Sequence, residues 1–173
     1  MASVDINKYD EYFYSAGEEF GVRPEIIKNI ALTENRRLNP NIVRKNSNGT
    51  YDIGLMQINT IRLKELKKIG ITKSDLKDPR ESIRAAAYII SKIVNRYGDS
   101  DYAIATYHSK TAKYKKRWLK RFKKLKDIAY LDLSSQSNSE DKFVFVDNDI
   151  QKDKIYVEHK QNLGKLLTFI TED

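Results

Sequence analysis

Residues 24–34 read PEIIKNIALTE and have the periodicity of an amphipathic helix that begins at a proline. One face of this helix carries side chains at steps of three and four residues: Ile27, Ile30, Ala31 and Glu34. That face is apolar except for Glu34, and a carboxyl group in apolar surroundings favours its neutral form. A carboxylic acid that keeps its proton can act as a general acid. The alternative is a glutamate at a helix end that turns outward into water, which is common in proteins.

A helix is also predicted before this segment, over residues 6–20, and Gly21 would end it. Its apolar face would carry Tyr9, Tyr12, Phe13, Ala16 and Phe20. The helix that contains Glu34 would be broken at Asn39 and Pro40, because proline lacks the N–H that a helix interior needs.

The next segment is predicted to mix turns, a strand and a helix. Residues 46–49 read NSNG, which is a strong turn signal, and residues 50–53 are a candidate for a short strand. Residues 60–69 are predicted to be helical and to end at Gly70.

A longer helix is predicted to start at Pro79, with Asp78 as its N-cap, and to stop at Gly98. Its buried face would carry Ile83, Ala86, Ala87, Ile90, Val94 and Tyr97. A short helix would follow over residues 100–109.

A basic helix is predicted over residues 112–126, and its charge has two interpretations. Residues 113–126 hold nine of the 32 Lys and Arg residues and no acid, so the positive charge is local. Lysines interleaved with aromatic residues can bind nucleic acid. Here, however, one helical face carries Tyr114, Trp118, Phe122 and Leu125. This spacing favours a helix packed on the core with solvated lysines and no nucleic-acid partner. The positive face would still attract an anionic cell wall or membrane surface.

The composition changes toward the C-terminus. We predict a helical domain over residues 5–126, a polar linker over 127–141 and a β-like appendage over 142–173. The appendage contains short apolar runs at residues 143–146, 155–157 and 166–170. Three such strands form a marginal unit by themselves, so the appendage is expected to lean on the helical domain or on a partner.

The composition also limits the chemistry. The chain has no cysteine, which excludes disulfides, thiol nucleophiles and thiolate metal sites. Its two histidines, His108 and His159, show no metal-ligand spacing, so we expect neither a metal nor an organic cofactor. No apolar run is long enough to span a membrane, and residues 1–7 lack the apolar core of a secretory signal. The protein therefore either works in the cytoplasm or has had a signal segment removed.

Three motifs together resemble a known family. The first is Val22-Arg23-Pro24, which leads to Glu34; the second is GLMQI at residues 54–58, followed by Asn59; the third is ATYH at residues 105–108. These motifs resemble those of the soluble-type (family 1) lytic transglycosylases, and most closely the small members associated with secretion and conjugation machines. The resemblance covers roughly residues 5–126 and implies a mainly α, lysozyme-like (goose-lysozyme/transglycosylase) helical domain that precedes the small C-terminal β-like appendage.

The motifs also depart from the family pattern at three places. Asn35 follows the glutamate where the family usually has serine, and His108 follows the tyrosine where asparagine is usual. The glycine expected shortly after that tyrosine is replaced by Ser109 and Lys110. His108 is a variant that also resembles the secretion-associated subgroup. Asn35 and the missing glycine motivate one alternative, a non-catalytic protein that binds the cell wall as a scaffold.

The resemblance implies the substrate and the chemistry. The substrate would be the glycan strand of peptidoglycan, cut between N-acetylmuramic acid and N-acetylglucosamine. Glu34 would protonate the leaving oxygen and then accept a proton from the 6-hydroxyl of the sugar, which gives a 1,6-anhydro end without consuming water. A lysozyme-type hydrolase on the same fold is the other enzymatic alternative, and it would use Asp52 as the second carboxylate. Asp52 is otherwise a turn or capping residue.

The candidate substrate-binding residues surround the second and third motifs. Gln57 can donate and accept hydrogen bonds at once, which suits sugar hydroxyl and acetamido groups, although it can also be a buried brace of the backbone. By resemblance, Tyr107 would lie near Glu34 or line the adjacent subsite. Met56 is expected at the core and the cleft floor, and the weaker candidates are Asn59 and Tyr51. We expect His108 to be structural or part of the cleft wall, without a role in proton transfer.

The expected setting follows from this chemistry. The protein would act in the periplasm of a Gram-negative bacterium after removal of its signal segment. Its partners would be peptidoglycan strands and, through the C-terminal region, a secretion, conjugation or pilus apparatus.

Overall fold

The computed structural model describes residues 5–129, 155–158 and 167–170. The chain divides into two units, residues 1–132 and 133–173, and each is described by itself. In the second unit, β4 (Ile155–Glu158) pairs antiparallel with β5 (Leu167–Ile170), so that Ile155 lies opposite Ile170. These strands match two of the three predicted apolar runs. The predicted run at 143–146 and most of the predicted linker lie outside the described residues.

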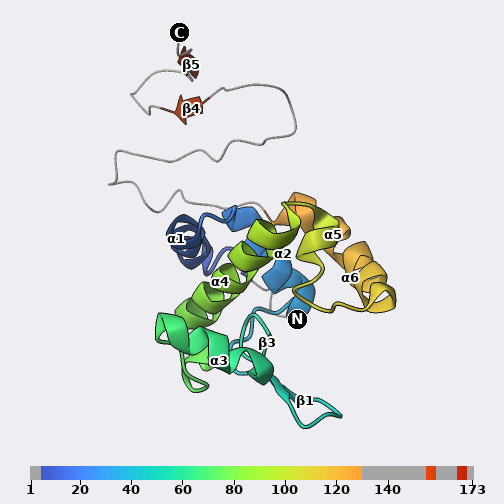
Figure 1. The fold of residues 1–173 in the computed structure, drawn as a ribbon. Coiled ribbons are helices and arrows are strands. Elements are labelled where there is room, and N and C mark those ends of the chain that lie inside the picture. Colours follow the sequence, from blue (N-terminus) through green and yellow to red (C-terminus); the bar gives the residue numbers. More distant parts are fainter. Residues whose placement is uncertain (1–4, 130–154, 159–166, 171–173) are drawn as a thin grey trace. The chain divides into compact units, whose positions relative to one another are not determined.

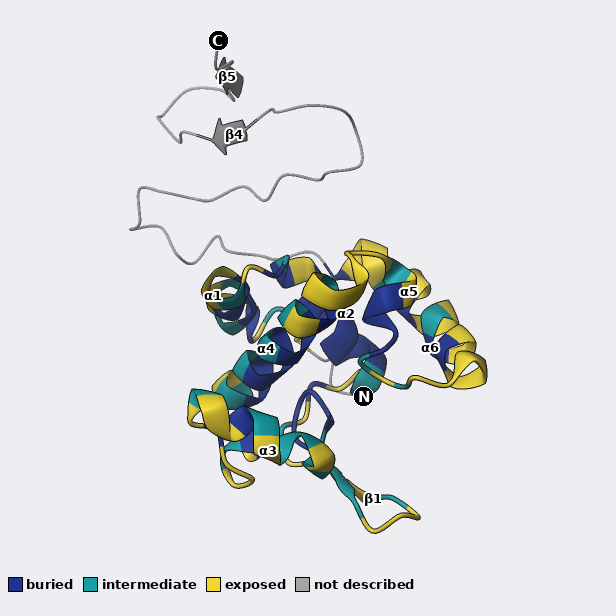
Figure 2. Cartoon of the chain, in the orientation of Figure 1, coloured by how far each residue is buried: buried dark blue, intermediate teal, exposed yellow. Residues whose placement is uncertain are grey.

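Helix α2 (Pro24–Glu34) is the central helix of the first unit. All but two of its 11 residues are buried, and Figure 2 shows it in dark blue between the other helices. The predicted apolar face is confirmed, since Ile27, Ile30 and Ala31 are fully buried. The helix ends at Glu34 and not at Asn39, because Asn35 leaves the helical conformation with a ψ of 77°. Glu34 is therefore the last residue of the helix.

Helix α1 (Asp10–Phe20) packs against α2 and begins later than predicted. Its core side includes Phe13 and Ala16, as expected. The preceding residues turn aside, so that the Asn7 side chain accepts a hydrogen bond from Lys28 Nζ at 2.8 Å. Lys28 is fully buried, and its Nζ lies 2.7 Å from Asp10 Oδ1. The start of α1 thus supplies the counterion for a charge on α2.

A small antiparallel sheet forms one side of the first unit. Its strands β1 (Val43–Lys45), β2 (Tyr51–Ile53) and β3 (Ile58–Asn59) lie in the order β1-β2-β3, below α2 in Figure 1. The strand predicted at 50–53 is confirmed by β2.

The loop from β2 to β3 requires glycine at its first position. Gly54 has a φ of 77°, and a Cβ at this position would lie 1.8 Å from the carbonyl oxygen of Leu76. Only glycine allows this approach. Met56 N also donates to Ser82 Oγ at 3.2 Å, so the GLMQ loop is held against the helix that contains Ser82.

The segment predicted as one helix over residues 60–69 is divided into shorter pieces. These are η1 (Thr60–Arg62), α3 (Leu63–Leu66) and η2 (Lys67–Ile69), and the segment ends at Gly70 in the left-handed conformation, as predicted. A further turn, η3 (Asp75–Lys77), precedes helix α4 (Pro79–Tyr97).

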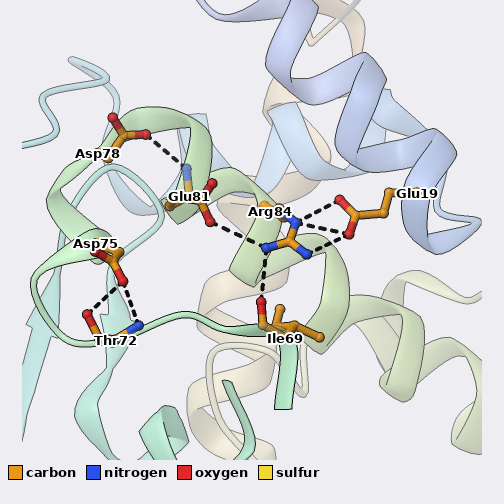
Figure 3. Close-up of polar contacts among 7 residues, drawn as sticks. All are labelled: Glu19, Ile69, Thr72, Asp75, Asp78, Glu81 and Arg84. Atoms are coloured by element: carbon orange, nitrogen blue, oxygen red, sulfur yellow. Dashed lines mark hydrogen bonds and ion pairs between the residues drawn. The ribbon is translucent and has the colours of Figure 1, made fainter. Parts of the chain in front are cut away.

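Helix α4 is capped as predicted and is tied to α1 at the surface. Asp78 accepts from Glu81 N at 3.1 Å. Arg84 donates from Nε and Nη2 to the Glu19 carboxylate at 2.8–2.9 Å and from Nη1 to the carbonyl of Ile69 at 3.1 Å (Figure 3). This fork joins α1, α4 and the end of η2, and the Glu19 carboxylate raises the pKa of Arg84.

The last helices differ from the prediction in detail. The predicted helix at 100–109 is only four residues long, α5 (Asp101–Ile104), and is followed by turns in which Tyr107 N donates to Ile104 O. Helix α6 (Ala112–Leu125) is confirmed and leads into η4 (Lys126–Ile128). The packed unit continues past residue 126, because Ala129 is buried.

Two aromatic residues predicted on buried faces are exposed. Tyr97 lies in the last turn of α4 and Tyr114 in the first turn of α6, where the neighbouring elements no longer cover the helix. The rest of the predicted α6 face is confirmed for Trp118 and Phe122, which are buried. Within the described residues, no helix is long and apolar enough to cross a lipid bilayer.

Candidate active site

A cleft of about 610 Å³ opens beside the C-terminal end of α2. One wall comes from the β1–β2 hairpin and β3, and the other comes from the turn after α5 and the start of α6. The candidate residues that line it are Glu34, Asp52, Gln57, Asn59, Tyr107 and His108. Residues that are distant in sequence therefore gather around one carboxyl group.

Glu34 projects into this cleft while remaining largely sheltered. Its side chain is 10% exposed. Trp118 Nε1 donates to Glu34 Oε1 at 2.8 Å, and His108 Nδ1 lies 3.0 Å from the same oxygen. The described residues provide no hydrogen bond to Oε2. Because an indole N–H can only donate, Oε1 must accept, which leaves Oε2 as the oxygen free to carry a proton.

Trp118 is the site residue that the sequence analysis assigned only to the core. Its ring is fully buried and stacks on Phe122, with ring centroids 4.9 Å apart. The His108 ring lies nearly parallel to the Trp118 ring, with the ring centroids 6.1 Å apart. A buried indole N–H usually has a hydrogen-bond partner, and this requirement is the signal that could have linked Trp118 to an acceptor. His108, expected to be structural or part of the wall, contacts Glu34 directly.

Asn35 uses its amide to connect α2 to the GLMQ loop. Its Nδ2 donates to the carbonyls of Asn39 at 2.7 Å and Leu55 at 3.3 Å, and its Oδ1 accepts from Asn39 N. The departure from serine at this position therefore retains a hydrogen-bonding role. It fixes the loop that contains Gln57 relative to Glu34.

Gln57 braces the backbone of its loop and also lines the cleft. Its Nε2 donates to Gly54 O at 2.8 Å, which braces the loop, and its φ of 50° is strained for a residue with a side chain. Its Oε1 is buried and has no hydrogen-bond partner among the described residues, although Gln57 lines the cleft. An unsatisfied buried acceptor costs about 1–3 kcal/mol, so this oxygen is a local cost of the loop conformation.

Tyr107 links the turn after α5 to the same loop. Its hydroxyl donates to the Met56 carbonyl at 2.9 Å. Burial, together with the negative charge of Glu34, raises the pKa of the Tyr107 phenol well above its usual value. The phenol is therefore neutral and can keep donating to Met56.

Two candidate residues do not line the cleft. Met56 is fully buried in the core, as expected, but it does not form part of the cleft floor. Tyr51 is also absent from the cleft lining, and its ring lies under Lys73 Nζ at 5.1 Å. Within GLMQI the side chains alternate, and the cleft receives Gln57 and Ile58 instead.

Asp52 and Asn59 form a pair on the sheet side of the cleft. They lie opposite each other in the β2–β3 register, and Asn59 Nδ2 donates to Asp52 Oδ1 at 2.7 Å. Asp52 therefore shares a cleft with Glu34 but already has an amide partner. In the part of the chain that is described, no three His, Asp or Glu side chains gather closely enough to hold a metal ion.

This architecture is a mainly helical, lysozyme-like fold with an acid at the end of its buried central helix. Residues 11–131 match the family model described as Transglycosylase SLT domain, and the chain belongs to this family.

Relatives with similar sequences are small proteins of enteric bacteria. The chain is 32% identical over 123 residues to the invasion protein IagB of Salmonella typhi, which covers 66% of this chain and 76% of IagB. It is 32% identical over 125 residues to protein IpgF of Shigella flexneri, covering 70% of this chain and 80% of IpgF. A peptidoglycan-binding-like protein of Escherichia coli O157:H7 is 32% identical over 133 residues, which cover 73% of this chain and 80% of that protein.

A solved structure with the same fold is that of the lytic transglycosylase Slt from Pseudomonas aeruginosa, studied as an inactive glutamate-to-glutamine mutant. The TM-score is 0.51 and the sequence identity is 18%. The match covers 71% of this chain but only 21% of Slt, so the likeness concerns the fold of one part of that protein.

Proposed function

We propose that this protein is a peptidoglycan lytic transglycosylase. It cleaves the bond between N-acetylmuramic acid and N-acetylglucosamine and forms a 1,6-anhydro-muramic end, with Glu34 as the single acid and base. The observation that carries the proposal is the Glu34 carboxyl itself. It is sheltered within a cleft, and its hydrogen bonds with the described residues, His108 and Trp118, both involve Oε1.

In the first step, Glu34 Oε2 donates its proton to the glycosidic oxygen. The C1–O bond of the muramic sugar breaks, the N-acetylglucosamine end leaves as an alcohol, and positive charge develops at C1. Glu34 becomes a carboxylate. The Trp118 N–H, 2.8 Å from Oε1, supports this charge, because hydrogen bonds to an ionised acceptor are stronger than those to a neutral one.

In the second step, the Glu34 carboxylate accepts the proton of the 6-hydroxyl. O6 bonds to C1 of the same sugar, which closes the anhydro ring and returns Glu34 to its acid form. No water is consumed. One carboxyl group serves both steps because each step reverses the protonation change of the other.

The other cleft residues have supporting roles in this proposal. Gln57 and Asn59, whose side chains line the cleft, contribute polar contacts to the glycan. Tyr107 lines the cleft and holds the GLMQ loop through Met56 O. Asn35 holds the same loop from α2.

The relatives support the substrate and suggest the setting. The Slt mutant is inactive after a glutamate-to-glutamine change, and the Escherichia coli relative is described as peptidoglycan-binding-like. We assign the helical domain, predicted over residues 5–126, to the periplasm. We assign the appendage, predicted over residues 142–173, to docking on a secretion, conjugation or pilus apparatus. The invasion protein IagB fits such an association.

A second candidate is hydrolysis on the same fold, because Asp52 lines the same cleft as Glu34. Asp52 would then assist attack by water, and the product would have a reducing end. However, Asp52 accepts a hydrogen bond from Asn59 Nδ2, and this contact favours a structural role for Asp52 in the β2–β3 wall of the cleft.

The experiment is digestion of purified peptidoglycan, with the products identified by mass spectrometry. We expect anhydro-muramic ends from the wild-type protein and from Asp52→Asn, and no products from Glu34→Gln. Reducing ends that disappear in Asp52→Asn would establish the hydrolase. Unchanged clearance by Glu34→Gln would overturn both enzymatic assignments.

A further inference from the structure

A second depression, of about 720 Å³, adjoins the cleft at Glu34. Glu34 and Arg44 line both, so the two depressions meet at the carboxyl group. The second one runs over the end of α2 and along the C-terminal part of α6. We call it the basic groove, and the residues that define its charge are Arg36, Arg37, Arg44, Arg121 and Lys124.

The charge of the basic groove is not compensated by the described part of the protein. All five of its cationic side chains are exposed, and none takes part in a recorded ion pair with a described residue. Among the described residues, Glu34 is the only acid that lines it. Like charges gathered in a concave surface repel one another and concentrate anions, so the groove suits a ligand with several negative charges.

The floor of the basic groove is partly apolar. It contains Leu32, Ile42, Leu125 and Ile128, and the last of these is exposed. A ligand that fills the groove therefore needs aliphatic groups as well as anionic ones. A glycan strand stripped of its peptides offers only the single carboxylate and methyl group of each lactyl side chain, because its sugar rings are neutral and polar. The peptide stems of peptidoglycan offer more of both, since each stem combines carboxylates with alanine methyl groups.

We propose that the basic groove binds the anionic peptide stem attached to the muramic sugar that is cleaved. This inference rests on the proposed function. The stem begins at the lactyl group on O3 of the ring whose C1 reacts beside Glu34, so it starts within one sugar of the carboxyl. The groove opens at the same carboxyl. The protein therefore selects glycan strands that still bear peptides over stripped strands.

Helix α6 offers a matched pair of variants for the test. Arg121 and Lys124 line the basic groove, whereas Arg117 and Lys120 are exposed on the same helix and line neither depression. The double variants Arg121→Gln with Lys124→Gln and Arg117→Gln with Lys120→Gln remove the same residue types at the same spacing. Any effect of net charge alone is therefore equal in the two.

The measurement is kcat/KM for each protein on soluble glycan chains with stems and on the same chains after an amidase has removed the stems. For the groove variant, Arg121→Gln with Lys124→Gln, we expect kcat/KM to fall about tenfold on stem-bearing chains. On stripped chains its kcat/KM should match that of the wild type. We expect the control variant to match the wild type on both. Added salt should reduce the difference in kcat/KM between the wild type and the groove variant on stem-bearing chains, because these charges are exposed.

The outcomes separate the two proposals. If the wild type cuts neither chain, the proposed function fails. If the wild type cuts both kinds of chain and the groove variant loses the same factor in kcat/KM on both, the stem assignment is overturned. It is also overturned if the groove variant cuts both normally but loses binding to vesicles of anionic lipid or to DNA, because the groove would then serve a different polyanion.

Discussion

Helix α2 has a lysine, Lys28, near its middle and a glutamate, Glu34, at its C-terminal end, and the surroundings of these two side chains differ. Lys28 is fully buried, with its Nζ 2.7 Å from the Asp10 carboxylate and 2.8 Å from Asn7 Oδ1. Glu34 keeps 10% of its side chain exposed, and its partners are the neutral Trp118 N–H and the His108 ring. The ion pair of Lys28 with Asp10 joins α2 to α1 inside the protein. Glu34 has no Lys or Arg within ion-pair distance in the described residues, and His108 Nδ1 lies 3.0 Å from its Oε1.

The largest effect is expected from Glu34→Gln, which removes the proton but keeps the shape. General acid–base catalysis contributes roughly 10²–10⁴-fold, so kcat should fall by about that factor. The Trp118 N–H can still donate to the amide oxygen, and the thermal unfolding midpoint should remain close to that of the wild type. Retained activity would show that α2 carries two structural charges rather than one.

Lys28→Met should have the opposite effect, with a loss of stability and no loss of activity per folded molecule. Removing one partner of a buried ion pair typically costs about 3–5 kcal/mol, because the remaining charge is left uncompensated. Urea unfolding should show this loss, while the folded fraction keeps its activity per molecule. The double change Lys28→Met with Asp10→Leu should restore much of the stability, because no buried charge then remains. If the double variant were no better than the single one, the pair would not explain the loss.

Trp118→Phe tests whether the neutral N–H donor of Trp118 is important for the function of Glu34. The ring that stacks on Phe122 is retained, but the 2.8 Å hydrogen bond to Glu34 is lost. Hydrogen bonds to charged groups contribute about 1.5–3 kcal/mol, so kcat should fall roughly 10–100-fold. Circular dichroism should be unchanged. A fall in stability without a fall in kcat would make Trp118 a core residue only.

Tyr107→Phe tests the brace between the turn after α5 and the GLMQ loop. It leaves the Met56 carbonyl without the hydroxyl 2.9 Å away, which should cost about 1–3 kcal/mol of stability. Because the pKa of the Tyr107 phenol is raised, the wild-type pH–rate profile should show no limb from its ionisation below its ordinary value near pH 10. A limb that disappears in the variant would contradict this.

The smallest effect is expected at Asp75, in the surface network of Figure 3 and away from the cleft lining. Hydrogen bonds from Thr72 lower the pKa of Asp75. Its carboxylate therefore stabilises the fold above its unfolded pKa, near 3.9, and this contribution is lost as the pH falls through the lower folded value. Asp75→Asn should lower the melting midpoint slightly at pH 7, should make no difference in strong acid, and should leave kcat unchanged.

Local patterns predicted the elements that carry the site. Pro24 at a helix start, Asp78 as an N-cap and Gly70 at a segment end were readable because caps and breakers depend on neighbours a few residues away. The same locality explains the errors. The helix predicted at 100–109 is shortened to α5, because the turns after Ile104 bring Tyr107 to Met56, which lies far away in the sequence.

The sequence by itself determined a helical domain with one acid on an apolar helix face, because periodicity and capping act over a few residues. The family motifs around Glu34, Gln57 and Tyr107 were readable for the same reason. Tertiary structure alone decided that Trp118 and His108 meet Glu34 on one oxygen, that Met56 is buried while Gln57 lines the cleft, and that five cations line one groove. Such contacts join residues that only the packing of separate helices brings together, and a pattern within one helix does not specify which side chain of another will reach it.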